Sequence, residues 1–377
     1  GAVVANDDGT LLSRTNNVHR THREGFTFTN GLLYRHKFAL KRRTFSANLT
    51  TSISNQDSRG TLVADNWYTT DTTATTHLDQ RSDGGSLTQR HGLDLSYTEP
   101  LSRQSQLQLS VAPSVQLSDA EKLTYDTEPA SGAELLNTGL SNSADNNITT
   151  LRGGLSYRLR DGKVTFSAGV DGLITGMVSE QTYPQVIRVQ RDFLNVLPNG
   201  MFMYKPDKTT RLRVNYRTTT RTPSIAQLQH VVDNSDPLKL TTGNLALQQG
   251  YQHTLSANFN TSDSTRTRPF FAMVMLQAEQ DRISNVTYAN STDSVLADGT
   301  ALPAGAQLTL PMNLDGHLAG RLLTNYTVPV AALKSNVNLS FGGSTERLPG
   351  AVNSLLYFTW NTNVNAGVSI STAMSRM

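Results

Sequence analysis

The stretch that decides the fold is residues 354–371, which read SLLYFTWNTNVNAGVSIS. Apolar and polar side chains alternate along it with a period of two. One phase carries Leu356, Phe358, Trp360, Thr362, Val364, Ala366, Val368 and Ile370, and the other carries Tyr357, Thr359, Asn361, Asn363, Asn365, Gly367 and Ser369. This period predicts a long β-strand with one apolar and one polar face.

The same alternation recurs along the whole chain as hairpins. We expect them within residues 26–54, 93–115, 151–170, 194–216, 255–276 and 318–341, followed by the final strand. Tight turns fall at 39–42, 100–104, 160–163 and 205–210, and the third turn contains Asp161-Gly162, a strong hairpin signal. The count is about thirteen strands. Many strands with one apolar and one polar face fit a wall between lipid and a wet lumen, which is the pattern of an antiparallel transmembrane β-barrel.

Long polar connections alternate with the tight turns. They cover about residues 55–86, 118–147, 178–190, 219–249, 280–309 and 343–353. In outer-membrane barrels the short turns are periplasmic and the long loops extracellular. We therefore expect these six segments to be loops that face outward from the cell.

A recurrent tyrosine supports the same topology. One tyrosine precedes each of five turns on the apolar phase of its strand: Tyr34, Tyr97, Tyr157, Tyr204 and Tyr326. A ring at the membrane boundary with its hydroxyl in water forms an aromatic girdle. The frequency of tyrosine in ordinary strands is the simpler alternative.

Composition excludes several classes of protein. Hydrophobic residues make up 37% of the 377 positions and charged residues 17%. No run approaches the roughly 20 apolar residues of a membrane helix. The net charge of +3 is scattered over the chain, which argues against nucleic acid as a partner. The absence of cysteine is compatible with export.

The sequence contains no recognisable catalytic, cofactor-binding or metal-binding motif. A phosphate-binding glycine loop, a Gly-x-Ser-x-Gly elbow and a His-Glu-x-x-His helix are all absent. His19 and His22 are better explained as solvated polar residues than as metal ligands. Asp233-Asn234-Ser235-Asp236 could offer oxygens to calcium, but turn chemistry explains it more simply. We predict that the protein is not an enzyme.

One segment carries a more specific signal. It contains Arg-x-Pro-Ser-x-x-x-Leu from residue 221, Asp-x-Ser-Asp-Pro-Leu from residue 233 and Gly-Asn-x-x-Leu from residue 243. This segment resembles the outer-membrane β-barrel family allied to TonB-dependent receptors. The matching positions are Arg221, Pro223, Leu228, Asp236, Pro237, Gly243 and Asn244. Leu245, Gln248 and Gln249 depart from the family's Gly-Asn-Pro-x-Leu-x-Pro-Glu pattern, whereas residues 311–316, PMNLDG, resemble its Pro-x-Asn-x-x-Gly start of a strand.

The resemblance implies a barrel of about 22 strands in the bacterial outer membrane, with a lumen closed by an amino-terminal plug domain. Such receptors take up a large, scarce nutrient with energy delivered through TonB. By this resemblance residues 1–377 are an incomplete barrel domain, and the plug and the closing carboxyl-terminal strands lie outside it. The expected partners are outer-membrane lipid, the plug, TonB and a nutrient ligand that the sequence leaves unspecified.

Two other classes of protein remain open. A plugless barrel would be a passive pore or a structural scaffold, and a plug-sized domain upstream in the gene would argue against it. A soluble or secreted β-solenoid adhesin would need a short fixed repeat, whereas this hairpin unit is long and its two connections differ in length. An isolated open wall would leave two unpaired edges, so we expect the span to form an incomplete, C-shaped sheet.

Overall fold

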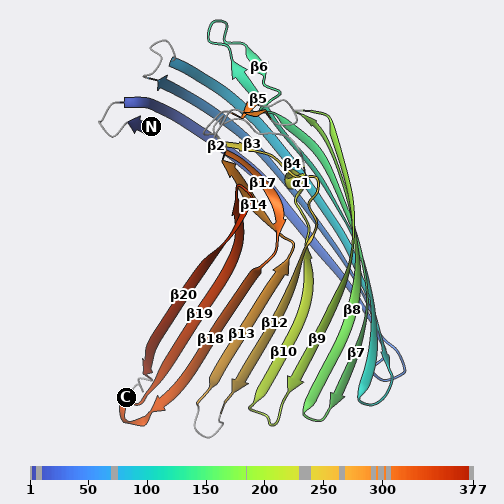
Figure 1. The fold of residues 1–377 in the computed structure, drawn as a ribbon. Helices are drawn as coiled ribbons and strands as arrows, with labels where there is room; N and C mark the ends of the chain where they lie inside the picture. Colours follow the sequence, from blue (N-terminus) through green and yellow to red (C-terminus); the bar gives the residue numbers. More distant parts are fainter. Residues whose placement is uncertain are drawn as a thin grey trace, which may run out of the picture.

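The computed structural model describes residues 2–5, 11–68, 75–183, 185–228, 239–262, 268–289, 294–295, 301–302 and 307–372. Long antiparallel strands form a curved wall around an open space (Figure 1). Along this wall the strands are β2 (Leu11–Lys37), β3 (Thr44–Tyr68), β4 (Thr75–Pro100), β5 (Ser105–Thr127), β7 (Asn142–Asp161), β8 (Val164–Tyr183), β9 (Ile187–Tyr204), β10 (Arg211–Arg221), β12 (Gly250–Thr261), β13 (Phe270–Gln280), β18 (His317–Val330), β19 (Ser335–Val352) and β20 (Leu355–Thr372). Among the described residues, no helix is long and apolar enough to span a membrane.

The remaining elements are short. They are β1 (Ala2–Ala5), β6 (Glu134–Leu136), α1 (Ile225–Leu228), β11 (Lys239–Thr241), β14 (Arg282–Ala289), β15 (Ser294–Val295), β16 (Ala301–Leu302), β17 (Gln307–Leu314) and the 3₁₀ turn η1 (Ala331–Leu333). The main sheet has 18 strands rather than about thirteen, because β1, β6, β11, β14 and β17 join it. These short strands have too few alternating positions to be recognised in the sequence.

The ladder is open. In the described part of the chain β20 pairs only with β19, and β2 pairs with β1 and β3, so no hydrogen-bonded ladder joins β2 to β20 there. The wall is thus C-shaped, as expected from the sequence.

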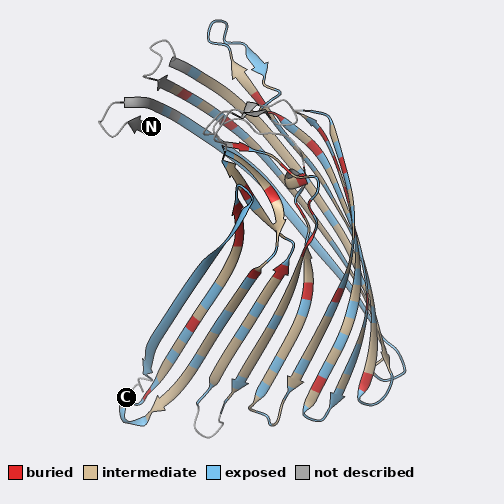
Figure 2. Cartoon of the chain, in the orientation of Figure 1, coloured by how far each residue is buried: buried red, intermediate tan, exposed pale blue. Residues whose placement is uncertain are grey.

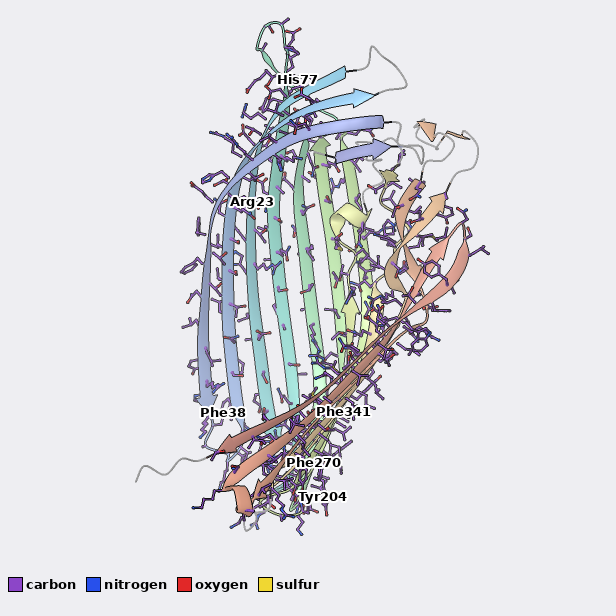
Figure 3. All side chains as sticks on the ribbon, turned by 90° about the vertical axis from the view of Figure 1, so that its left-hand side faces the viewer. Arg23, Phe38, His77, Tyr204, Phe270 and Phe341 are labelled. Carbon is purple, nitrogen blue, oxygen red and sulfur yellow. The ribbon has the colours of Figure 1, made fainter. Side chains whose placement is uncertain are left out.

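The two faces of the wall divide as the alternation predicts. α1 lies within the space that the sheet surrounds, so the face toward α1 is the luminal face (Figures 1 and 3). Along β8, exposed Phe166, Val170 and Ile174 alternate with less exposed Thr165 and Thr175. The apolar residues lie on the convex face, away from α1.

Register carries this apolar phase around the wall as a belt. A rung here means a row of residues paired side by side across successive strands. One rung consists of Leu95, Val111, Gly153 and Gly172. The next rung toward the tight turns consists of Tyr97, Leu109, Leu155 and Val170. Trp360, Val364 and Val368 are 60%, 65% and 71% exposed. β20 lies at the edge of the sheet and is exposed on both faces, so its exposure does not separate one face from the other. The alternating exposure along β8 is therefore the stronger evidence that the apolar face is the exposed one. Figure 2 shows that buried positions are few and scattered over the wall.

The residues of the short turns explain why the chain reverses direction there. Gly162 has φ of +48°, which glycine adopts at low cost, and it lies with Lys163 between β7 and β8. In the turn after β9, the Asp207 carboxylate accepts hydrogen bonds from the Thr209 hydroxyl and from the backbone N–H groups of Thr209 and Thr210. These bonds lower the pKa of Asp207, the Thr209 hydroxyl contributing most.

The expectation that residues 55–86, 118–147, 178–190 and 343–353 form long loops is wrong. Most of these residues belong to long strands, since β3 and β4 pair as far as Trp67 and Thr75, and β8 and β9 as far as Gln181 and Ile187. Beyond the belt both faces of a sheet meet water, so the ladder continues without apolar alternation. The sequence pattern ends where the hydrocarbon ends, not where the strand ends.

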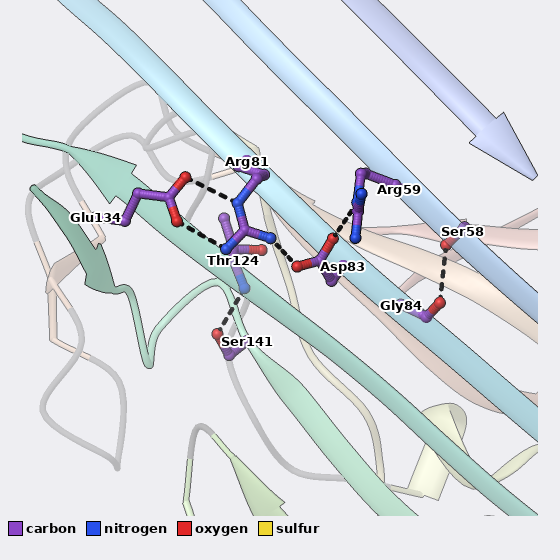
Figure 4. Close-up of polar contacts among 8 residues, drawn as sticks. All are labelled: Ser58, Arg59, Arg81, Asp83, Gly84, Thr124, Glu134 and Ser141. Carbon is purple, nitrogen blue, oxygen red and sulfur yellow. Dashed lines mark hydrogen bonds and ion pairs between the residues drawn. The ribbon is translucent and has the colours of Figure 1, made fainter. Parts of the chain in front are cut away.

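Ion pairs stabilise these extended strands. The Arg81 guanidinium donates two hydrogen bonds of 2.8 Å to Glu134 on β6 and also contacts Asp83, which Arg59 reaches at 3.0 Å (Figure 4). The Ser141 hydroxyl accepts a 3.0 Å bond from the backbone N–H of Thr124. Hydrogen bonding from Arg81 lowers the pKa of Glu134. The hairpin that carries β6 is thereby attached to the wall.

Charged substitutions should distinguish the two faces. Leu109→Arg places a cation on the convex belt and should destabilise the inserted protein by about 2–4 kcal/mol. Gln108→Arg, one residue earlier on the luminal phase, is the matched control and should cost far less. Denaturant titration of protein folded into lipid vesicles measures both, and equal losses would contradict the assignment of the faces.

The β6 hairpin should detach in acid. Because the folded pKa of Glu134 is lowered, the ion pair stabilises docking above the ordinary glutamate pKa of about 4.3, and this stabilisation is lost as the pH falls through the folded value. The chain lacks cysteine, so Ala130→Cys accepts a single dye whose anisotropy should fall over that range. Glu134→Gln should give low anisotropy at neutral pH, whereas Glu121→Gln should behave like the parent.

Candidate functional site

The family-motif segment folds onto the luminal face instead of forming an outward loop. Leu228 and Leu247 are almost fully buried and pack with Met177 of β8 and Val189 of β9. Met177 and Val189 belong to the luminal phase, and Ile283 of β14 packs against the same cluster. The expectation of an outward loop over residues 219–249 is therefore wrong for the described residues up to 228 and from 239, because their apolar side chains have a core to fill inside the wall.

Two motif asparagines tie this segment to the rest of the lumen. Asn244 donates from its side chain to the Pro311 carbonyl at 3.0 Å, and its backbone N–H donates to the Gln227 carbonyl at 2.7 Å. Asn313 accepts from the Gln248 N–H at 2.8 Å and donates to the carbonyls of Gln248 and Asp281, at 3.1 and 2.7 Å. Hydrogen bonds thus join the Gly-Asn stretch from residue 243 to the Pro-x-Asn stretch from residue 311.

The departures from the family pattern can be located. Gln249 is buried, donates to the Thr222 hydroxyl at 2.8 Å and accepts from Asn195 of β9. A neutral amide both donates and accepts at this position, whereas a carboxylate would only accept. Leu245, in place of proline, is exposed.

A buried ionic cluster lies where β13 turns into β14. The Glu279 side chain is fully buried on the luminal phase, 2.8 Å from Arg282, 3.5 Å from Arg221 and 3.8 Å from His317. His317 in turn contacts Glu346 at 2.9 Å. The cluster accompanies a bend at Asp281, whose φ is +52° and whose N–H donates to the Asp315 carboxylate at 2.9 Å. Sequence analysis missed Glu279, although one carboxylate after the apolar run FFAMVML is a usable signal.

The structure brings together only some of the predicted motif residues. Gly243 is buried, Pro223 is among the most deeply buried residues, and Arg221 ends β10 within reach of Glu279. Asp236 and Pro237, together with the acidic stretch from Asp233, lie outside the described residues.

A polar hollow of about 590 Å³ adjoins the ionic cluster. Most of its lining residues belong to the luminal phase, among them Gln277, Arg321, Ser344, Glu346, Asn361 and Asn363. Amides, hydroxyls and opposite charges in one hollow suit hydrogen bonding to a polar partner. This surface and the motif segment form the candidate functional site.

The five predicted girdle tyrosines lie toward the tight-turn end of the wall. Figure 3 labels Tyr204, Phe38 and Phe270 at that end of the wall. Phe38 lies 6.2 Å from Tyr97 and Phe270 lies 6.1 Å from Tyr326, between ring centroids. Tyr34, Tyr157 and Tyr204 are exposed.

A second aromatic group lies at the opposite end of the belt, which sequence analysis did not predict. Tyr216 and Tyr251 flank His253, with the Tyr216 hydroxyl 2.8 Å from His253 Nδ1, and Phe358 and Trp360 lie on β20. In the described part of the chain no three histidine or acidic side chains are placed to hold a metal. His22 instead contacts Glu24 at 2.7 Å.

An apolar convex belt, a polar concave face and a segment folded into the lumen define the wall of an outer-membrane β-barrel. The sequence profile of the outer membrane protein β-barrel family matches residues 36–375, and the chain belongs to that family. The protein is therefore a component of the bacterial outer membrane. No curated protein sequence matches the chain.

Solved outer-membrane transporters and receptors are similar to this chain at low identity. The RagAB peptide importer aligns with a TM-score of 0.51 and 12% identity over 92% of this chain and 37% of its own. The ferric citrate transporter FecA gives 0.41 and 10% over 92% and 59%, and the alcaligin receptor FauA from Bordetella pertussis gives 0.43 and 11% over 97% and 66%. This chain thus spans less than two thirds of each.

Removal of one asparagine side chain should loosen the luminal segment. Asn313→Ala deletes three hydrogen bonds and leaves backbone groups of residues 248 and 281 unpaired, at a cost of about 1–3 kcal/mol. Hydrogen exchange of residues 239–249 should accelerate. Asn363→Ala, on the exposed strand β20, is the control, and unchanged exchange in Asn313→Ala would refute the role of this side chain.

Proposed function

We propose that this chain forms the barrel wall of a TonB-dependent receptor that takes up a large nutrient ligand. The observation that carries the proposal is the polar luminal face, onto which the motif segment folds. Its hydroxyls, amides and ion pairs offer hydrogen bonds to a plug domain, and the extended strands beyond the belt offer a surface for ligand capture.

We also propose that the complete barrel has about 22 strands, of which residues 1–377 supply an incomplete set. The absence of a ladder between β2 and β20 among the described residues supports this proposal, as does the greater length of the RagAB importer chain, of which this chain covers 37%. A single wall in lipid needs partners for both edges. The plug and the TonB-contacting segment belong to the same proposal.

The tyrosines at the tight-turn end are proposed to form the periplasmic girdle. The exposure of Tyr34, Tyr157 and Tyr204 on the apolar phase supports this role, because a ring in the interface keeps its hydroxyl in water. The motif residues Arg221, Pro223, Leu228, Gly243 and Asn244 are proposed to be structural. Asp236 and Pro237 are assigned the same role on the family pattern alone.

Conductance distinguishes the receptor from a plugless passive pore. We expect the full-length protein in a planar bilayer to conduct little, because the plug fills the lumen. Deletion of the plug should give steady conductance and should abolish energised uptake in cells without preventing insertion. Steady conductance of the intact protein, or uptake that survives the deletion, would overturn the receptor assignment.

Single cysteines provide a second measurement. Asn363→Cys and Val364→Cys place thiols on opposite faces of β20, and residues 1–377 hold no other cysteine. In the plugged receptor, plug deletion should increase labelling of Cys at 363 by a bulky water-soluble maleimide, and leave labelling at 364 unchanged. Equal labelling at 363 with and without the plug would count against a filled lumen.

A further inference from the structure

An apolar groove of about 440 Å³ interrupts the convex belt near its end away from the tight turns. Its lining includes Tyr216, Leu255, Leu276, Leu318, Gly320 and Trp360. Register places Tyr216, Leu255, Leu276 and Gly320 on one rung of the sheet. Because tight turns are periplasmic in this class of barrel, the groove faces the outer leaflet.

The missing side chain of Gly320 contributes to the groove. A Cβ placed at residue 320 would lie 3.6 Å from Leu276 and 3.8 Å from Thr345, at ordinary contact distance. The position therefore has room for a side chain, and glycine leaves a depression between the leucines and Trp360. No close backbone approach at this position requires glycine.

A cation lies beside this groove. Arg347 pairs in register with Leu318 and with Trp360, both of which line it. The guanidinium lies 4.7 Å from the centre of the Phe358 ring and 5.9 Å from that of Trp360, and its Nε donates to the Gly316 carbonyl at 2.8 Å. Within the described residues, no carboxylate lies within 4.0 Å of it. The terminal nitrogens of the guanidinium keep donors for an anion.

We propose that this groove binds an anionic acyl lipid, with its phosphate on Arg347 and an acyl chain along Gly320. A guanidinium presents paired donors that match phosphate oxygens, and a half-buried cation on a lipid-facing surface favours an anionic neighbour. Lipid tails are as apolar as the groove, so burial of the chain gives little selectivity by itself. Selectivity comes from the charge. This site is independent of the plug and of TonB.

Native mass spectrometry tests the proposal on protein extracted from outer membranes in a nonionic detergent. The probes are phosphatidylglycerol and phosphatidylcholine with identical acyl chains. The parent protein should prefer phosphatidylglycerol by roughly tenfold, the ratio that about 1.4 kcal/mol of charge-assisted hydrogen bonding provides. Arg347→Gln should remove the preference, and Gly320→Leu should weaken binding of both lipids.

Matched controls separate the site from general effects. Arg188→Gln removes an arginine that lies on the same face of the wall as Arg347 but already pairs with Glu180 at 3.2 Å. Gly172→Leu adds a side chain at a glycine of the convex belt away from the groove. Both should bind like the parent. Equal binding of the two lipids to the parent, an unchanged preference in Arg347→Gln, or displacement of phosphatidylglycerol by inorganic phosphate alone would each overturn the proposal.

Discussion

The structure depends on one constraint: a backbone that crosses hydrocarbon must pair all its N–H and C=O groups within the protein. The antiparallel ladder meets this demand between neighbours from β2 to β20. Among the described residues, the demand is unmet along the outer edge of β20 and along that of β2 beyond its short pairing with β1. Side-chain alternation follows from the same constraint, because a strand paired on both sides can meet its two solvents only through its two faces.

Beyond the apolar belt, water can pair with the backbone groups, yet the strands remain hydrogen-bonded to one another. Water solvates both faces of β3, β4 and β5 there, so the polar residues 55–61 and 79–86 extend the sheet as well as apolar ones would. Ion pairs such as Arg81 with Glu134 then align neighbouring segments in place of lipid-facing packing. Such exposed pairs contribute little free energy singly, and their value here is positional.

The lumen uses a different chemistry from the belt. Asn244 and Asn313 hold separate segments because each side-chain amide both donates to and accepts from backbone groups. Gln249 does the same with two side chains, since it donates to Thr222 and accepts from Asn195. Glu279 is the buried charge of this region, and three basic side chains surround it. Together they fix a bend that brings β14 and the motif segment over the inner face of β8 and β9.

The sequence alone predicted the class of fold, because many long strands such as 354–371, each with one apolar and one polar face, fit a wall between lipid and a wet lumen. It also located the turn at Asp161-Gly162 and the motif from Arg221, whose signals are local. Tertiary structure decided where the strands end, since polar residues such as 55–61 are equally compatible with a loop and with a solvated strand. It also decided that Leu228 and Leu247 point inward and that Arg347 meets Trp360. Both depend on the register between strands that are distant in the sequence. That register is set by pairing between strands, and no local stretch of sequence contains the information for it.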